Sequence, residues 1–284
     1  MKTSKPIKDN SYAVYGLGLS GISTFKFLKK KNVKKIYTWD DKINKNNKKK
    51  FNLFKKILDE VDYIVISPGI NIQKTKFKLK LFKNKKKIIT DLDLFYMQQI
   101  PIKSVVITGT NGKSTACKLT QHVLKTSKLD AQLGGNIGKP VLDLKIKKKS
   151  VIIIEASSFQ LSYTKFIKPN FAAILNISRD HLDWHNTITN YQNSKFKIFS
   201  KQDGNDIALL GNKKLVKLFY KKNYLSKLKI IKKKSLNNKI KQKISNNYLL
   251  SEPNLENLLF VHQVSKLFKI KEKIFLKAVN SFKG

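Results

Sequence analysis

The chain of 284 residues carries 59 basic and 18 acidic side chains, which gives a formal net charge of +41. Only Arg179 among the basic residues is an arginine, and the lysines lie in runs such as Lys232 to Lys243 without interleaved aromatic residues, which argues against a dedicated nucleic-acid binder. The single cysteine, Cys117, excludes a disulfide framework, and no apolar run is long enough for a membrane-spanning helix or a signal peptide. We therefore expect a cytoplasmic protein of two domains.

The first part of the chain has the pattern of a Rossmann-like domain. A strand is predicted over residues 12–15, followed by the glycine loop Gly16-Leu-Gly-Leu-Ser-Gly21 and a helix over 22–30. The next predicted strand ends at Asp40, about 20 residues beyond the glycines, where a dinucleotide-binding unit places its ribose-binding acid. Further strands are predicted over 61–66 and 88–89. Taken alone, these residues indicate a parallel sheet that binds a dinucleotide.

The pattern restarts near Ile100, so we predict domains over residues 1–99 and 100–284. A strand from Val105 runs into Gly109-Thr-Asn-Gly-Lys-Ser-Thr115, and a helix follows over 115–126. The backbone N–H groups of such a loop bind phosphate oxygens, Lys113 can reach the β- and γ-phosphates of a nucleoside triphosphate, and a hydroxyl can bind Mg²⁺. Two residues separate the glycines where the standard motif has four. The sequence therefore predicts a P-loop-type α/β domain that binds a nucleoside triphosphate through a variant loop.

Two later strands are expected beside this loop. An apolar run over 151–154 ends in Glu155, and a second run over 172–177 leads into Ser178-Arg-Asp-His181. Because the carboxyl ends of parallel strands share one edge of a sheet, we expect both polar ends near the glycine loop. The periodic signal weakens after Asn205 and returns at Ser251-Glu-Pro-Asn254, which is typical of a helix start.

Seven segments in this order resemble the Mur ligases of peptidoglycan synthesis, over nearly the whole chain. Within that family, the chain is most similar to the enzymes that join D-glutamate to UDP-N-acetylmuramoyl-L-alanine. The segments are Gly16-Leu-Gly-Leu-Ser-Gly21, Ser67-Pro-Gly69, Gly109-Thr-Asn-Gly-Lys-Ser-Thr115, Gly134-Gly-Asn-Ile-Gly138, Glu155-Ala-Ser-Ser-Phe-Gln-Leu161, Asn176 with Asp180-His-Leu-Asp183, and Tyr191-Gln-Asn-Ser-Lys195.

The resemblance implies an ATP-dependent, ADP-forming amide ligase. A carboxylate of the UDP-linked substrate takes the γ-phosphoryl group, and the amine of D-glutamate attacks the resulting acyl phosphate. The ATP-binding residues implied are Gly109, Thr110, Asn111, Gly112, Lys113, Ser114, Thr115, Asn254 and Asn257. The sequence departs from the family pattern near the implied adenine contacts, because Pro253 and Ser251 stand where the family usually has histidine and glycine.

Two Mg²⁺ sites are also implied. Ser114 and Glu155 would hold one ion, and His181 would bind the second. Lys195 matches a carbamylated lysine whose added carboxylate can bridge toward metal, because a free ammonium group would be repelled there. Lys113, Glu155, His181 and Lys195 are thus the expected catalytic residues. By their residue types alone, His181 and Lys195 would be an ordinary hydrogen-bonding histidine and a solvated lysine.

In the first domain, the resemblance replaces the dinucleotide with the UDP part of the substrate. Leu19 and Ser20 would face the diphosphate, Asp40 the uracil and Gly69 the neighbouring loop. Asn136 would contact the sugar-peptide part.

Relatives continue into a third domain that binds the incoming amino acid, whereas this sequence ends at Phe282-Lys-Gly284. We therefore expect the C-terminal domain to be absent, with the chain a fragment or with that domain supplied by a separate polypeptide. An alternative is a non-catalytic relative that keeps the UDP-sugar and nucleotide sites. An NAD-dependent oxidoreductase rests on the first glycine loop only and leaves the second unexplained. The sequence leaves open the incoming amino acid, the state of Lys195 and the oligomeric state.

Overall fold

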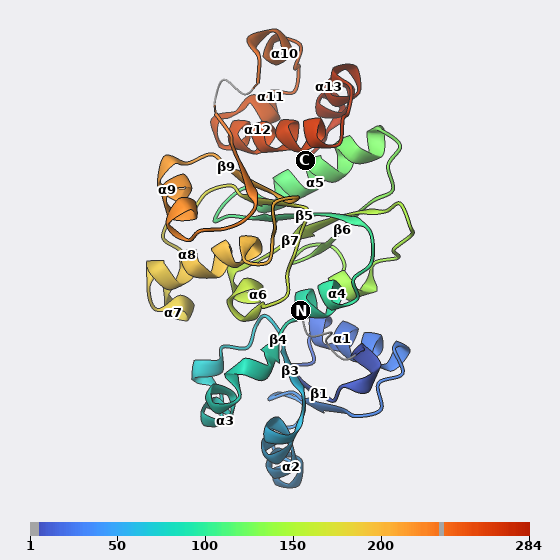
Figure 1. Ribbon diagram of the computed structural model, residues 1–284, viewed down its shortest axis with the longest axis vertical. Helices are drawn as coiled ribbons and strands as arrows, with labels where there is room; N and C mark the ends of the chain where they lie inside the picture. Colours follow the sequence, from blue (N-terminus) through green and yellow to red (C-terminus); the bar gives the residue numbers. More distant parts are fainter. Residues whose placement is uncertain (1–5, 233–235) are drawn as a thin grey trace. The chain divides into compact units, whose positions relative to one another are not determined.

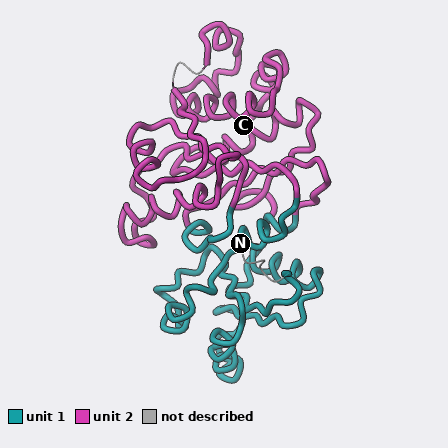
Figure 2. The backbone as a smooth tube through the Cα atoms, viewed as in Figure 1, with its two compact units in different colours: residues 1–100, 140–143, 159–167 teal, residues 101–139, 144–158, 168–284 magenta. Residues whose placement is uncertain are grey.

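The computed structural model describes residues 6–232 and 236–284. Residues 233–235, within the lysine run that begins at Lys232, lie outside this description. The chain divides into two compact units (Figure 2): unit 1 comprises residues 1–100, 140–143 and 159–167, and unit 2 comprises 101–139, 144–158 and 168–284. Two short segments that the sequence analysis assigned to the second domain thus belong to unit 1.

Unit 1 is built on a parallel sheet of four strands in the order β2-β1-β3-β4. Its strands are β1 (Tyr12–Tyr15), β2 (Ile36–Trp39), β3 (Tyr63–Ile66) and β4 (Ile88–Ile89). Its α-helices are α1 (Leu19–Lys30), α2 (Lys48–Glu60), α3 (Lys78–Lys83), α4 (Asp91–Met97) and, from its second residue, α6 (Ser158–Tyr163). Four 3₁₀ helices complete it: η1 (Ile7–Asp9), η2 (Ile72–Lys74), η3 (Lys85–Lys87) and η4 (Val141–Asp143).

Side chains of β1 alternate between two separate cores. Ala13 and Tyr15 pack with residues of α2 and α3, whereas Tyr12 and Val14 pack with residues of α1 and α4. Helix α2 forms within a lysine-rich segment because its apolar residues recur at three- and four-residue spacing and its buried face is apolar. The helices therefore cover both faces of the sheet, as in a doubly wound fold.

Unit 2 contains a parallel sheet of six strands in the order β10-β9-β8-β5-β7-β6. The strands are β5 (Lys103–Thr108), β6 (Ala131–Gly135), β7 (Val151–Glu155), β8 (Phe171–Ile174), β9 (Ile207–Leu210) and β10 (Lys227–Ile230). The helices are α5 (Lys113–Thr126), α7 (Leu182–His185), α8 (Ile188–Phe196), η5 (Lys197–Phe199), α9 (Lys213–Lys221), α10 (Asn238–Gln242), α11 (Asn247–Leu250), α12 (Glu252–Leu267) and α13 (Glu272–Ser281).

The sheet of unit 2 is covered on both faces. Helices α5, α12 and α13 lie on one side and α8 on the other (Figure 1). Val105 and Ile107 of β5 belong to the same core as residues of α5, α12 and α13. The expected fold class, a Rossmann-like α/β domain followed by a P-loop-type α/β domain, is confirmed by these two parallel sheets. Among the described residues, no helix is both long and apolar enough to cross a membrane.

Several elements differ from the predictions in their bounds or were not predicted at all. Helix α5 begins at Lys113, two residues early, because Gly112 adopts a φ of +80° and caps its N-terminus. Strand β8 ends at Ile174, so Asn176 lies in the following loop. After Asn205, where periodicity was weak, the chain forms β9, α9 and β10. Lysines on the exposed faces of these elements obscure the alternation that would reveal them.

Candidate active site

The glycine loop of unit 2 lies at the centre of its sheet. It joins β5 to α5, and β5 pairs with β7 on one side and β8 on the other. The chain crosses from β5 toward β6 and later from β7 toward β8, so the loop lies where the direction of the connections reverses. In open α/β sheets this is where ligands bind, beside the carboxyl ends of the strands. Polar residues that end β7 and follow β8 therefore flank the loop.

Glu155, at the end of β7, links two of the predicted residues. Its carboxylate accepts a hydrogen bond of 2.8 Å from the hydroxyl of Ser114 and another of 2.8 Å from the side-chain amide of Asn136. The residue is 1% exposed. A carboxylate and a hydroxyl oxygen at one point are the ligands that Mg²⁺ prefers, so this pair fits the first predicted metal site. Asn136, predicted to contact the sugar-peptide part of the substrate, is hydrogen bonded to Glu155 in this structure.

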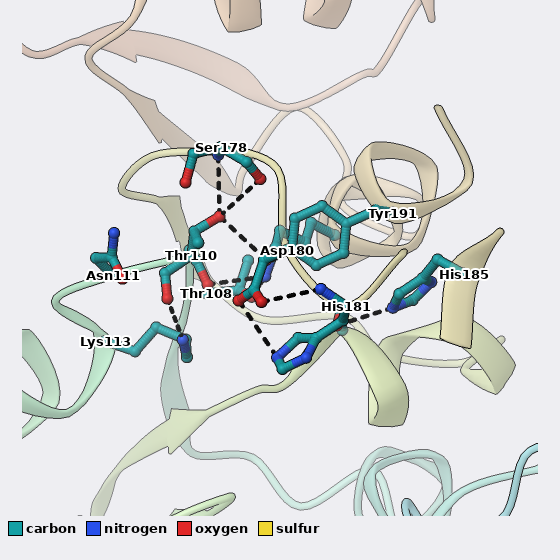
Figure 3. A network of polar contacts seen from close by, with 12 residues as sticks. Thr108, Thr110, Asn111, Lys113, Ser178, Asp180, His181, His185 and Tyr191 are labelled. Carbon is teal, nitrogen blue, oxygen red and sulfur yellow. Dashed lines mark hydrogen bonds and ion pairs between the residues drawn. The ribbon is translucent and has the colours of Figure 1, made fainter. Parts of the chain in front are cut away.

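Lys113 and Asn257 approach the loop itself. The ammonium group of Lys113 donates to the carbonyl of Thr110 at 2.7 Å, within its own loop (Figure 3). The side chain of Asn257, which is 1% exposed on α12, fills the space beside Gly112, where an added Cβ would lie 2.3 Å from its Oδ1. Asn257 in turn donates to Asn254 at 3.3 Å. The structure thus brings the two predicted adenine-side asparagines together, with Asn257 directly beside the loop.

Asn176 holds the loop backbone from the β8 side. Its Oδ1 accepts the N–H of Asn111 at 2.9 Å, and its Nδ2 donates to the carbonyl of Asn111 at 3.3 Å. The same Nδ2 donates to Glu256 of α12 at 3.4 Å. Burial raises the pKa of Glu256, and the bond from Asn176 partly opposes this rise. No role was predicted for Asn176 or Glu256, although Asn176 lies near the end of a predicted strand and in one of the seven segments that resemble the family.

Thr110 has a second set of partners (Figure 3). Its hydroxyl lies 3.0 Å from the hydroxyl of Tyr191 on α8 and accepts the N–H of Ser178 at 3.0 Å. Its own N–H donates to the carbonyl of Asn176 at 3.0 Å. The loop is therefore fixed by residues that follow β8 and by α8 before any ligand binds.

Lys195 of α8 is 1% exposed and lies beneath the start of the loop. Its ammonium group donates to the carbonyl of Gly109 at 2.8 Å and to the hydroxyl of Thr108 at 3.4 Å, and it lies 4.5 Å from the ring centre of Tyr191. The pKa of Lys195 is lowered to about 7, mainly by burial and also by the charge of Lys113, while Asp180 opposes the shift. Residue type alone would make this lysine solvated, whereas the structure buries it.

His181 and His185 occupy different environments. His181 has a φ of +50°, and its Nε2 lies 3.3 Å from the carboxylate of Asp180 at the protein surface. His185 is buried and lies 3.0 Å from the hydroxyl of Ser158. Burial lowers the pKa of His185 to about 4, with the charge of Lys195 acting in the same direction. Across residues 6–232 and 236–284, no three His, Cys, Asp or Glu side chains are grouped as a ready-made metal site.

Of the predicted UDP-binding residues of unit 1, Leu19 and Ser20 belong to the glycine loop itself, and Asp40 binds its backbone. Leu19, in the first turn of α1, is 81% exposed, and the hydroxyl of Ser20 lies near the carboxyl group of Asp91 on α4. Asp40 accepts the N–H of Leu17 at 2.8 Å, and this bond is the main cause of its lowered pKa. Gly69 is exposed, and nothing lies within 4 Å of where its Cβ would be.

Comparison with known proteins identifies the family. A family profile described as the Mur ligase middle domain matches residues 107–275. The chain belongs to the Mur ligase family. Proteins named UDP-N-acetylmuramoylalanine--D-glutamate ligase are similar to this Mur ligase. The one from Aquifex aeolicus is 37% identical over 71% of this chain and 46% of its own length, and the one from Rickettsia prowazekii is 31% identical over 98% and 67%.

Solved structures share the fold of this Mur ligase. The UDP-N-acetylmuramate:L-alanyl-gamma-D-glutamyl-meso-diaminopimelate ligase from Neisseria meningitides aligns with a TM-score of 0.61 at 13% identity, covering 97% of this chain and 98% of that one. The UDP-N-acetylmuramate-alanine ligase from Thermotoga maritima aligns with a TM-score of 0.51 at 16% identity, covering 97% and 69%. The chain spans about half of the length of the Aquifex aeolicus relative and two thirds of the length of the Rickettsia prowazekii relative.

Proposed function

We propose that this Mur ligase acts in ATP-dependent amide formation, in which D-glutamate is joined to UDP-N-acetylmuramoyl-L-alanine. The observation that carries the proposal is the hydrogen-bonded group of Ser114, Glu155 and Asn136 beside a glycine loop that bears Lys113. The named relatives, which reach 37% identity, support this choice of substrates.

The chain's own residues account for the first half of such a reaction. The loop N–H groups and the N-terminus of α5 attract the phosphates of ATP, and Lys113 exchanges the Thr110 carbonyl for a phosphoryl oxygen. The substrate carboxylate attacks the γ-phosphorus, and ADP leaves with the electron pair of the broken P–O bond. Mg²⁺, when bound by Ser114 and Glu155, supplies positive charge that offsets the repulsion between the two anions. The amine of D-glutamate then displaces phosphate from the acyl phosphate and loses a proton.

Carbamylation of Lys195 is part of this proposal. The side chain is 1% exposed, and none of the ion pairs found in the described residues includes it. A buried ammonium group without a carboxylate partner is costly, whereas a carbamate is an anion that metal can bind. In this scheme the Lys195 nitrogen forms a bond to the carbon of CO₂ and releases a proton. His181 is proposed as the partner of the carbamate in a second Mg²⁺ site.

The direct test is ADP release by the purified chain with ATP, Mg²⁺, UDP-N-acetylmuramoyl-L-alanine and D-glutamate, each omitted in turn. If the chain is a ligase, mass spectrometry should detect a product that is heavier than UDP-N-acetylmuramoyl-L-alanine by one glutamate residue. Hydroxylamine added without D-glutamate should trap the acyl phosphate as a hydroxamate. ATP and UDP-substrate binding without hydroxamate would instead favour the non-catalytic binder. Adding a short carboxylic acid such as acetate to Lys195→Ala tests the carbamate, because a free carboxylate in the vacated space should partly restore activity. Lys118→Ala, on an exposed residue, is the control.

A further inference from the structure

A buried acid lies behind the glycine loop of unit 1. Asp91, the first residue of α4, is 2% exposed, and the hydroxyl of Ser20 lies near enough to its carboxyl group to favour the ionised form. One carboxyl oxygen accepts the N–H of Leu92 at 3.0 Å. The other, Oδ2, has no hydrogen-bond partner among the described residues. Ser20 is in the first turn of α1, directly after the glycines, so the unsatisfied carboxyl group contacts the N-terminus of a 12-residue helix.

The charged groups on the elements around Asp91 do not neutralise it. Asp93 lies on the same helix, and Asp143 lies on η4, which packs against both α1 and α4. Lys165 lies beside Asp93, and its backbone N–H donates to that residue at 2.8 Å. Burial raises the pKa of Asp91 to about 6, the charge of Asp93 adds to the rise, and the bonds from Leu92 and Ser20 oppose it. Near neutral pH the acid is therefore close to taking up a proton.

We propose that Asp91 is a positioning residue for a diphosphate ligand at Gly16-Leu-Gly-Leu-Ser-Gly21, and that the ligand binds together with one proton taken up by the Asp91 carboxyl group. This inference rests on the proposed function, because the ligand is the UDP part of the substrate. The first-turn N–H groups of α1 attract its diphosphate, while an ionised Asp91 repels it.

Protonation of Asp91 removes that repulsion and reorients Ser20. The neutral acid donates its O–H to the Ser20 oxygen, and the Ser20 hydroxyl then donates its own proton to a ligand oxygen. When Asp91 is ionised, the Ser20 proton points to the carboxylate, and the hydroxyl offers the ligand only lone pairs. One proton moves from solvent to Asp91, and no covalent bond to the ligand forms or breaks.

Helix α1 carries a matched control one turn later. The hydroxyl of Ser23 donates to Asp143 at 2.7 Å, the same chemical pair as Ser20 and Asp91. Asp143 is exposed, whereas Asp91 is buried. If proton uptake on ligand binding is specific to the buried pair, it should be absent in Asp91→Asn and unchanged in Asp143→Asn.

The test is calorimetry of UDP-N-acetylmuramoyl-L-alanine binding to the full chain, repeated in buffers of different ionisation enthalpy between about pH 6 and pH 8, a range in which a carboxyl of unperturbed pKa does not titrate. We expect wild type to take up a substantial fraction of a proton and its affinity to rise by up to about tenfold as the pH falls across one unit. Asp91→Asn should bind with no uptake and little pH dependence. Asp143→Asn should behave as wild type, and Ser20→Ala should bind more weakly at every pH.

The outcomes separate this inference from the proposed function. Failure of wild type to bind at any pH would overturn the assignment of UDP binding to this loop, and with it the ligand of this proposal. Binding without proton uptake, or uptake that survives in Asp91→Asn, would overturn only the role of Asp91. If Asp91→Asn does not fold, as judged by circular dichroism, the wild-type uptake and the loss of affinity in Ser20→Ala still decide the question.

Discussion

The two glycine loops of this chain occupy equivalent places in two parallel sheets, yet their strand-end acids are used differently. In unit 1, Asp40 is bound by backbone N–H groups of Leu17, Lys42 and Ile43. In unit 2, Glu155 is bound by the side chains of Ser114 and Asn136. Side-chain donors can rotate away to admit a ligand, whereas backbone donors are fixed by the fold. The topology thus places both loops, and the donors around each acid decide whether it is available for chemistry.

The largest effect is expected from Gly21→Ala in the first loop. An added Cβ would lie 1.8 Å from the carbonyl oxygen of Gly16, a backbone atom that already accepts the hydroxyl of Ser67 at 2.8 Å. We expect a loss of about 3 kcal/mol or more in the free energy of unfolding, measured by thermal or urea denaturation. Gly18→Ala is the matched control, because nothing lies within 4 Å of its Cβ position. Equal stability of the two variants would contradict the packing described for this loop.

Lys113→Ala should show that ligand binding at the second glycine loop, unlike the first, depends on the positive charge of a lysine side chain. Lys113 is the only lysine in Gly109-Thr-Asn-Gly-Lys-Ser-Thr115, and the first loop has none. We expect binding of a nonhydrolysable ATP analogue to weaken by about 100-fold, because one charge-assisted bond to phosphate is lost. Calorimetry measures this, with the exposed Lys118→Ala as control. A similar loss in both variants would indicate nonspecific attraction by the highly positive chain.

Glu155→Gln tests whether the acid of unit 2 holds metal. The variant keeps the size of the side chain but removes the charge that a divalent cation needs. We expect Mg²⁺ to strengthen nucleotide binding by about tenfold or more in wild type and to have little effect in the variant. Glu272→Gln, on an exposed residue of α13, is the control. A persistent Mg²⁺ effect in Glu155→Gln would place the ion elsewhere.

The two units should also respond to acid in opposite directions. The pKa of Asp91 is raised to about 6 in the folded state, so unit 1 gains stability as the pH falls from 7 to 5 and the acid is protonated. The pKa of His185 is lowered to about 4, so unit 2 loses stability over the same range, because only the unfolded histidine takes up a proton. We expect changes of about 1 to 2 kcal/mol. Amide hydrogen exchange, corrected for the pH dependence of its intrinsic rate, measures the stability of each unit separately. A change of the same sign in both units would contradict the roles given to Asp91 and His185.

Features encoded locally could be predicted from the sequence. A glycine loop after an apolar run identifies the β5–α5 junction, and Glu155 follows its strand directly, so topology brings it to Ser114. The side-chain bonds of Asn176 could not be predicted, because its partners Asn111 and Glu256 lie 65 and 80 residues away in the sequence. Burial of Lys195 could not be predicted either, because nothing in its neighbouring residues distinguishes it from the many exposed lysines. Helix α2 was missed because its lysines conceal the spacing of its apolar residues.

Asn257 and Gly112 share one small volume, and this ties two distant positions of the chain together. A methyl group at position 112 would overlap the Asn257 amide, and the φ of +80° already disfavours any other residue there. Replacement of the asparagine by a bulkier side chain would push on the phosphate-binding backbone from α12. Evolutionary change at either site should therefore be rare unless both change in concert, so aligned descendants of this gene should show the two columns varying as a pair.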